Sequence, residues 1–159
     1  MLFSEYTFMF RKLPGFTQLF RPYGFAHCQP MIPRSHGSEG VAEVLKMSKR
    51  FGYEPLICGL KAHGSDNNML SYSGDGYSIG IDIHLKNVNK NNLEKFVRNL
   101  FEYTINCGGI TYLAKDELLP RDLFEKMYPR YTDFLKVKKK LDPNALFASD
   151  MYRRLLQPH

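Results

Sequence analysis

Residues 77–85 carry the clearest pattern in the chain, a strict alternation of apolar and polar side chains. The apolar positions are Tyr77, Ile79, Ile81, Ile83 and Leu85, and they are separated by Ser78, Gly80, Asp82 and His84. Successive side chains of a strand point to opposite faces of a sheet. The period of two therefore predicts a strand with one core face and one small, polar face. Shorter apolar runs predict three further strands, over 25–32, 55–63 and 110–113.

Two longer stretches follow the helical period of three or four residues instead. The apolar or small positions of the first are Val41, Val44, Leu45, Ser48 and Phe51, and Gly52 follows as the expected C-terminal stop. The second begins at Asn91–Glu94, which resembles a capping box, and ends at Gly108. Its apolar stripe consists of Leu93, Phe96, Val97, Leu100, Phe101 and Ile105. Further helices are expected near Pro120 and over 131–141.

The elements follow one another as β-α-β-β-α-β, the order of the ferredoxin-like or split βαβ arrangement. We therefore expect an α+β fold, with helices on one sheet face and a helical C-terminal extension. The other sheet face, where Gly80, Asp82 and Lys61 would point, is left for a partner or ligand. Residues 1–22 are rich in aromatic side chains and are interrupted by prolines. They are expected to form an arm or linker from a missing half, preceding a main domain over 23–159.

The charge of the chain narrows the class of partner. A net charge of +6 and a pI of about 9.2 favour an anionic partner, such as a phosphorylated ligand or an anionic membrane surface. Nucleic acid is not expected, because the aromatic residues lack the pattern of an RNA-binding sheet. No apolar run approaches the ~20 residues of a membrane span, and the N-terminus has the wrong charge order for a signal peptide. These features predict a cytoplasmic protein, or one peripheral at the inner membrane face.

Metal or thiol chemistry is not indicated by the sequence. The three cysteines, Cys28, Cys58 and Cys107, are far apart and form no C-x-x-C pair. Their spacing to the histidines fits no common metal site. The better candidate is Lys115, which follows the predicted strand 110–113. A lysine held at a strand end can be aimed at a substrate, although a solvated lysine paired with Asp116 would have the same local sequence.

Several segments together resemble one family. They are Gly24–Pro33, Leu60–Gly64, Met69–Tyr72, Gly76–Ile83, Gly108–Asp116, Met127–Arg130 and Leu141–Leu155. Their order and spacing are similar to the C-terminal half of FAD-dependent oxidases of the vanillyl-alcohol-oxidase type. Within that group they are most similar to the decaprenylphosphoryl-β-D-ribose 2′-oxidases. The resemblance covers nearly everything after residue 22.

The resemblance implies a cap, or substrate, domain whose sheet closes over a flavin ring. It implies that Lys115 is catalytic and lies beside the ring, as a base or as an electrostatic stabiliser. The other residues that it places toward substrate or flavin are Gln29, Lys61, Tyr112, Ser78 and Gly80. Family members often carry Asn and Cys at the strand positions of Ser78 and Gly80, so thiol chemistry at position 80 is not expected here.

The resemblance also implies a partner. The family holds FAD mainly through a glycine-rich loop in its N-terminal half, and these 159 residues contain no such loop. The chain is therefore expected to be a cap domain alone, as a fragment, a split subunit or a remnant, with FAD bound by a separate half. The implied substrate is a polyprenyl-phosphoryl sugar. The alternatives are a sugar-1,4-lactone oxidase and a non-catalytic, ferredoxin-like binding module.

Overall fold

The centre of the fold is a long strand with neighbours on both sides. The computed structural model describes residues 15, 18, 21–55, 58–115 and 117–157. Within them, five strands form one sheet: β1 (Phe25–Cys28), β2 (Pro30–Pro33), β3 (Cys58–His63), β4 (Gly76–His84) and β5 (Ile110–Thr111). β4 pairs antiparallel with β1 and β2 on one side and with β3 on the other. β5 pairs antiparallel with β2 and extends the sheet beyond it.

β1 and β2 occupy the place of the single first strand expected over 25–32. They keep one continuous register along β4, in which Cys28 lies opposite Ile81 and Met31 opposite Ser78. The two strands are separated only at Gln29. Proline at position 30 has no N–H to donate to a ladder, so the hydrogen-bonding pattern is interrupted there while the direction of the chain is kept.

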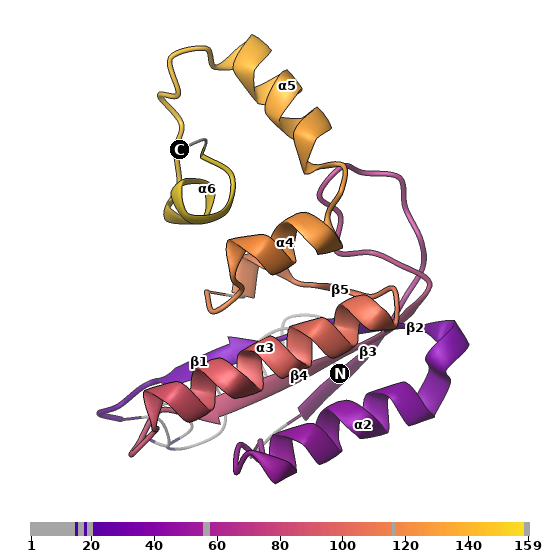
Figure 1. Ribbon diagram of the computed structural model, residues 1–159, viewed down its shortest axis with the longest axis vertical. Helices are drawn as coiled ribbons and strands as arrows, with labels where there is room; N and C mark the ends of the chain where they lie inside the picture. The colour runs from indigo at the N-terminus through magenta and orange to yellow at the C-terminus, as the bar shows by residue number, and fades with distance from the viewer. Residues whose placement is uncertain (1–14, 16–17, 19–20, 56–57, 116, 158–159) are drawn as a thin grey trace.

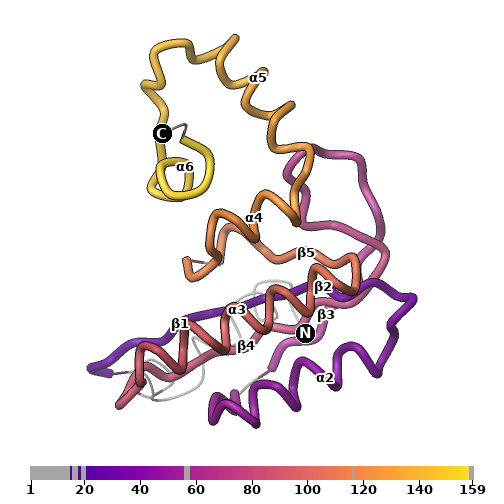
Figure 2. The backbone as a smooth tube through the Cα atoms, in the orientation of Figure 1, coloured from indigo at the N-terminus to yellow at the C-terminus, as the bar shows by residue number. Residues whose placement is uncertain are grey.

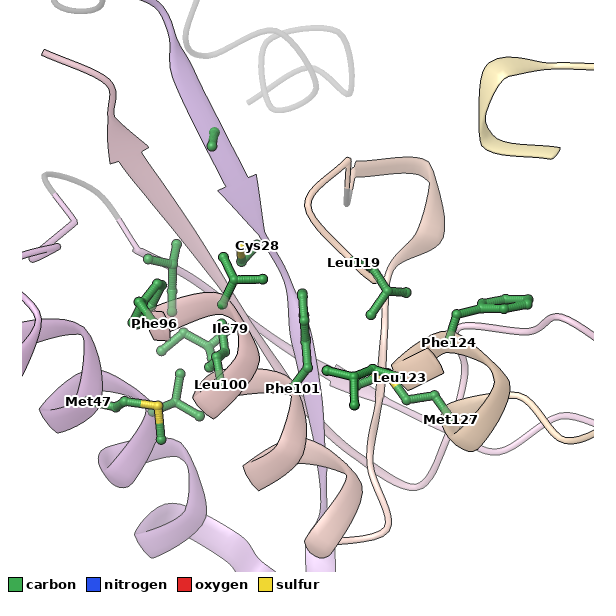
Figure 3. Close-up of a cluster of buried hydrophobic side chains, with 14 of the residues drawn as sticks. Cys28, Met47, Ile79, Phe96, Leu100, Phe101, Leu119, Leu123, Phe124 and Met127 are labelled. Atoms are coloured by element: carbon green, nitrogen blue, oxygen red, sulfur yellow. The ribbon is translucent and has the colours of Figure 1, made fainter. Parts of the chain in front are cut away.

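Two helices cover one face of this sheet: α2 (Gly37–Arg50) and α3 (Lys90–Asn106). Figure 1 shows both lying along the strands, with α3 crossing in front of β1 and β4. The apolar face of β4 packs against them through Ile79, Ile81 and Ile83, all at most 2% exposed. From α3 the fully buried partners are Phe96, Leu100 and Phe101, several of which are labelled in Figure 3. Burial of each such side chain contributes about 1.5–3 kcal/mol.

The C-terminal part of the chain forms a second group of helices, α4 (Arg121–Met127), α5 (Tyr131–Leu141) and α6 (Asp150–Leu155). α4 packs on α3 through Leu123 and Met127, which belong to the same core cluster as the sheet. The Tyr128 hydroxyl donates to the Thr111 carbonyl of β5 and so fastens this group to the sheet edge. In Figure 2 the long loop after β3 rises toward the start of α5.

Several boundaries differ from those expected from the sequence. The strand expected over 110–113 is β5, which ends at Thr111. Residues Leu113–Lys115 form a 3₁₀ turn, η4, instead. The α3 helix is capped by Asn89, whose side chain accepts from the Asn92 N–H at 3.1 Å. The capping box proposed at Asn91–Glu94 is therefore wrong by two positions. A short 3₁₀ turn, η3 (Arg34–His36), precedes α2.

The expected α+β class is confirmed: an antiparallel sheet is combined with helices and a helical C-terminal extension. The finer ferredoxin-like assignment stays an interpretation, since the first strand is divided and the last has only two residues. The N-terminal arm proposed for residues 1–22 lies almost entirely outside the described residues. Within the part of the chain that the structure describes, no helix is long and apolar enough to cross a membrane.

Candidate functional site

The sheet face opposite α2 and α3 is polar, as the alternation along β4 predicts. Because directly opposed residues of an antiparallel pair share a face, the register places Lys61 beside Ser78 and His27 beside Asp82. Gly59 lies opposite Gly80 between these two pairs. Side chains from three strands therefore meet on one surface, which we call the polar face and define by His27, Gln29, Lys61, His63, Ser78 and Asp82.

A chain of hydrogen bonds crosses this polar face. At one end, Nδ1 of His27 lies 2.5 Å from the Asp82 carboxylate. Nε2 of the same ring lies 3.3 Å from the Gln29 side-chain oxygen, and the Gln29 amide donates to Ser78 Oγ at 3.3 Å. At the other end, Nε2 of His63 lies 2.8 Å from Ser78 Oγ. Ser78 thus joins Gln29, which lies between β1 and β2, to His63 of β3, and both Ser78 and Gln29 are buried.

The glycine at position 80 makes room for His27. A Cβ added to Gly80 would lie 3.2 Å from Cε1 and 3.4 Å from Nε2 of the imidazole. The 3.2 Å separation is tighter than ordinary van der Waals contact, so a side chain at this position would require the ring to shift slightly. The absence of a thiol at position 80 thus coincides with a histidine that occupies the adjoining space.

Aromatic side chains close the other end of the polar face. The rings of Tyr72 and Tyr112 stack with centroids 4.6 Å apart, and His63 meets Tyr72 edge-on at 4.9 Å. Burial raises the pKa of Tyr72 to about 12, although nearby Ser78 and Gln29 act in the opposite direction. Its hydroxyl has no hydrogen bond of sound geometry among the described residues. Tyr72 therefore places a neutral hydroxyl next to this network of hydrogen bonds.

His63 is kept neutral by its surroundings. Burial lowers its pKa below the ordinary value of 6.5, and the positive charge of Lys61 lowers it further. A neutral imidazole can accept a hydrogen bond from the Ser78 hydroxyl, whereas a protonated one can only donate. At neutral pH the His63 end of this hydrogen-bond network is therefore uncharged.

Lys115 lies at the C-terminal end of η4, where its N–H donates to the Tyr112 carbonyl at 3.0 Å. The expected position at a strand end is wrong, because the chain leaves the sheet after Thr111. The Lys115 ammonium lies 5.9 Å from the Tyr112 ring centroid. Asp116, expected as its pair, lies outside the described residues.

A cavity of about 720 Å³ separates η4 from α6. It is lined by Phe25 and His27 of β1, by Leu113, Ala114 and Lys115 of η4, by Glu117, and by residues of α6 including Arg153 and Arg154. His27 is therefore shared between the cavity and the polar face. Lys115 and His27 therefore border the same cavity.

Sequence reasoning named six of the residues found in or beside this arrangement, namely Gln29, Lys61, Ser78, Gly80, Tyr112 and Lys115. It placed Asp82 on this sheet face, but it did not pair Asp82 with His27, and it missed His27, His63 and Tyr72 as parts of one site. The two histidines were considered only as metal ligands, and no group of three or more metal-ligating side chains occurs among the described residues. The signal that could have found His27 and Asp82 is their cross-strand pairing, which requires the register.

The fold and this face define a class of protein. It is an α+β domain with a polar sheet surface beside a cavity that is lined by acidic and basic side chains. The particular family follows from comparison with known proteins. A family model described as D-arabinono-1,4-lactone oxidase matches residues 13–155. The chain belongs to this family.

Two curated relatives show the extent of the similarity. Decaprenylphosphoryl-beta-D-ribose oxidase of Mycolicibacterium smegmatis is 29% identical over 153 residues, which are 94% of this chain and 32% of that protein. L-gulono-1,4-lactone dehydrogenase of Mycobacterium tuberculosis is 24% identical over 140 residues, which are 87% of this chain and 32% of that protein. The chain spans about a third of the length of the relatives it matches.

Proposed function

We propose that this chain is the substrate-facing domain of an FAD-dependent sugar oxidoreductase, with residues 23–159 forming the cap. The observation that carries the proposal is the polar face, where three strands place hydrogen-bonding side chains beside a cavity that also holds Lys115. Both relatives are named for oxidation of a sugar or a sugar lactone. The remaining two thirds of their length would correspond to an FAD-binding half, to which residues 1–22 would lead.

The polar face has features that fit a flat ring. Gly59 is exposed, and nothing lies within 4 Å of the position where its Cβ would be. A planar group can therefore approach the backbone of β3 closely at this point. Lys61 and Lys115 would hold the ring and the sugar from two sides, and the Tyr112 ring lies next to Lys115. When bound there, the flavin accepts the hydride that leaves the sugar carbon.

Within this proposal, Lys115 supplies positive charge where negative charge develops. Fixed cations in a partly dry site stabilise such charge without reorganising. Gln29 and Ser78 have a different part, since both are buried and bonded to neighbouring side chains. They would position the groups around them and shape the pocket, and Gly80 would do so by leaving space for His27.

The substrate proposed is a sugar whose secondary hydroxyl is oxidised. Two classes are supported by the relatives' names: a polyprenyl-phosphoryl ribose and a sugar-1,4-lactone. The order Tyr112-Leu113-Ala114-Lys115 resembles the polyprenyl-phosphoryl side, whereas the family model is that of a lactone oxidase. Both classes present a secondary carbinol for oxidation, so the same assay of flavin reduction can be run with each. The substrate that reduces the flavin faster identifies the class.

A peripheral contact with an anionic membrane is a further part of the proposal. Lys139 and Lys140 are exposed in the last turn of α5, before Leu141, which is 77% exposed. Leu146 and Phe147 follow at 79% and 81% exposure. Each lysine close to an anionic surface contributes ~1 kcal/mol. We expect the chain to sediment with anionic vesicles in low salt, and equal binding to neutral vesicles would contradict this contact.

The experiment that tests the proposed function is a titration of a separately expressed, FAD-loaded half with this chain. The half can come from a neighbouring reading frame or from a relative. We expect a saturable change in the visible flavin spectrum, because the polar face would replace water at the ring. The variant Lys61→Glu should weaken the change, whereas Lys49→Glu, on the far side of α2, should not. Equal behaviour of the two variants, or no spectral change, would sink the proposal.

A further inference from the structure

Among the described residues of the polar face, His27 combines two features that bear on proton transfer. Its Nδ1 is held 2.5 Å from the Asp82 carboxylate, and its ring also lines the cavity that contains Lys115. The side chains of His27 and Asp82 are 19% and 21% exposed, so the pair is mostly buried but still reaches solvent. An imidazole whose one nitrogen is fixed by a carboxylate is oriented to use the other nitrogen.

We propose that His27, oriented by Asp82, accepts the hydroxyl proton of the sugar during its oxidation. This inference rests on the proposed function. The carboxylate of Asp82 accepts the Nδ1 proton, which leaves the lone pair on Nε2. The atom 3.3 Å from Nε2 is Oε1 of Gln29, which can accept only. The neutral ring therefore makes no hydrogen bond to it, and an incoming hydroxyl can donate to Nε2 instead. Once the proton has moved, Nε2–H can donate to Gln29 Oε1. Gly80 favours this placement, since a Cβ there would crowd Cε1 of the ring at 3.2 Å.

The O–H bond of the carbinol breaks, and its proton goes to Nε2 of His27. The electron pair left on oxygen forms the second C–O bond as the carbon loses hydride to the oxidised flavin of the other half. The product is a carbonyl compound, and His27 is left as an imidazolium paired with Asp82. The cavity of about 720 Å³ beside the ring gives that proton a route to solvent.

His27 is better suited to this step than Lys115. A general base must present a lone pair to the proton that it accepts, and the Asp82 carboxylate on Nδ1 orients the His27 ring so that Nε2 can do so. The charged groups that face His27 are Asp82 from β4, Lys115 and Glu117 from the η4 region, and Asp150, Arg153 and Arg154 from α6. The two chemical roles left open for Lys115 are thereby divided: His27 takes the proton and Lys115 supplies charge.

The test uses the complex of this chain with an FAD-loaded half, mixed anaerobically with L-gulono-1,4-lactone in a stopped-flow instrument. We expect the rate of flavin reduction to fall at low pH in the wild type. In His27→Gln the rate should drop by about 100-fold or more, and the acidic limb should disappear. In Asp82→Asn the loss should be smaller. In His36→Gln, a change in the exposed η3 turn, the rate and limb should be retained.

Chemical rescue separates a base from a residue that only supports the pocket. In His27→Ala, added imidazole can enter the cavity and should restore a rate that depends on its uncharged form. A His27→Gln complex that is reduced at the wild-type rate with its acidic limb intact would overturn the proposal while leaving the proposed function in place. So would a His27→Ala complex that imidazole does not accelerate.

A readout without the flavin is available in the chain alone. Imidazole ¹⁵N NMR should show His27 protonated at Nδ1 in its neutral form, and Asp82→Asn should weaken that preference. A neutral His27 protonated at Nε2 would overturn the inference whether or not the complex turns over. A wild-type complex that no sugar reduces, together with the expected tautomer, would count against the proposed function instead.

Discussion

Ser78 is the residue on which the hydrogen bonds of the polar face converge. It is fully buried, receives the Gln29 amide and shares its hydroxyl with His63. A hydroxyl can donate one hydrogen bond while it accepts others, so it can link an amide to a neutral imidazole. Buried polar networks of this kind are costly when they are only partly satisfied. A change of charge at His63 is consequently expected to alter the hydrogen bonds of Ser78 and Gln29 as well.

Lys115 gives the most direct test at the scale of one residue. The side chain is exposed and ends a 3₁₀ turn, so Met in its place retains most of the stem and removes only the charge. If its charge acts like an oxyanion-hole donor, Lys115→Met should raise the barrier to flavin reduction by about 2.7–4 kcal/mol. The melting temperature of the chain should hardly change, because surface substitutions usually stay within about 0.5 kcal/mol. Stopped-flow reduction and thermal melting of the same samples measure the two effects.

His63 predicts a pH dependence of stability. Its pKa is lowered in the fold by burial and by Lys61, so below about pH 6.5 the unfolded chain binds more protons than the folded one. This contribution is present above the ordinary pKa of 6.5 and is lost as the pH falls toward the folded value. Melting curves across that range should show a smaller pH dependence for His63→Gln than for the wild type. The exposed control His36→Gln should leave the dependence unchanged, and identical curves for all three chains would refute the assignment.

At the scale of single elements, the sequence predicted those whose periodicity is strong. The alternation over 77–85 corresponds to β4 within one residue at each end, and Tyr131–Leu141 corresponds to α5. The stripe of the second helix is buried where expected, at Phe96, Val97 and Leu100. Leu45, placed on the core stripe of the first helix, is 38% exposed instead. Periodicity identifies a face, but the neighbours of that face decide how far its margins are covered.

The candidate site was less accessible to sequence reasoning for a physical reason. His27 and Asp82 are 55 residues apart, and only the antiparallel register of β1 and β4 brings them into contact. Lys115 could be singled out from its local sequence and from a resemblance to a family. The 3₁₀ turn on which it lies could not be predicted in the same way. The 3₁₀ turn of Leu113–Lys115 follows from where the ladder of β5 ends, at its two-residue pairing with β2.

Close backbone approach makes a prediction for the strands themselves. A Cβ added to Gly76 would lie 2.9 Å from Pro33 Cα and closer still to the Ile32 carbonyl, both of them backbone atoms that cannot rotate away. Gly76→Ala should therefore lower the free energy of unfolding by about 1–3 kcal/mol. Gly59→Ala is the matched control, because nothing lies near its added Cβ, and it should stay within about 0.5 kcal/mol of the wild type. Urea unfolding of both variants decides, and equal losses would contradict the packing described for β2 and β4.

At the scale of the whole molecule, the helices and the polar face lie on opposite sides of one sheet. α2 and α3 bury the apolar side of β4, so the fold has its core without using the polar face. The C-terminal group joins that core through α4 and lines the cavity through α6. A core that does not depend on the polar face fits the substrate-facing role that we propose for this domain. The comparison with relatives about three times as long is consistent with that division.

We propose that this chain supplies the surface on which a sugar is oxidised, while a second part supplies the flavin. The most direct test is the visible absorbance of an FAD-loaded half after anaerobic addition of D-arabinono-1,4-lactone, with and without this chain. The flavin band should bleach rapidly only when both parts are present, and polyprenyl-phosphoryl ribose should be tried in the same cuvette format. This chain alone, incubated with FAD and desalted, should carry no flavin band. Bleaching at the same rate without the chain, or no bleaching by either substrate with it, would contradict the account.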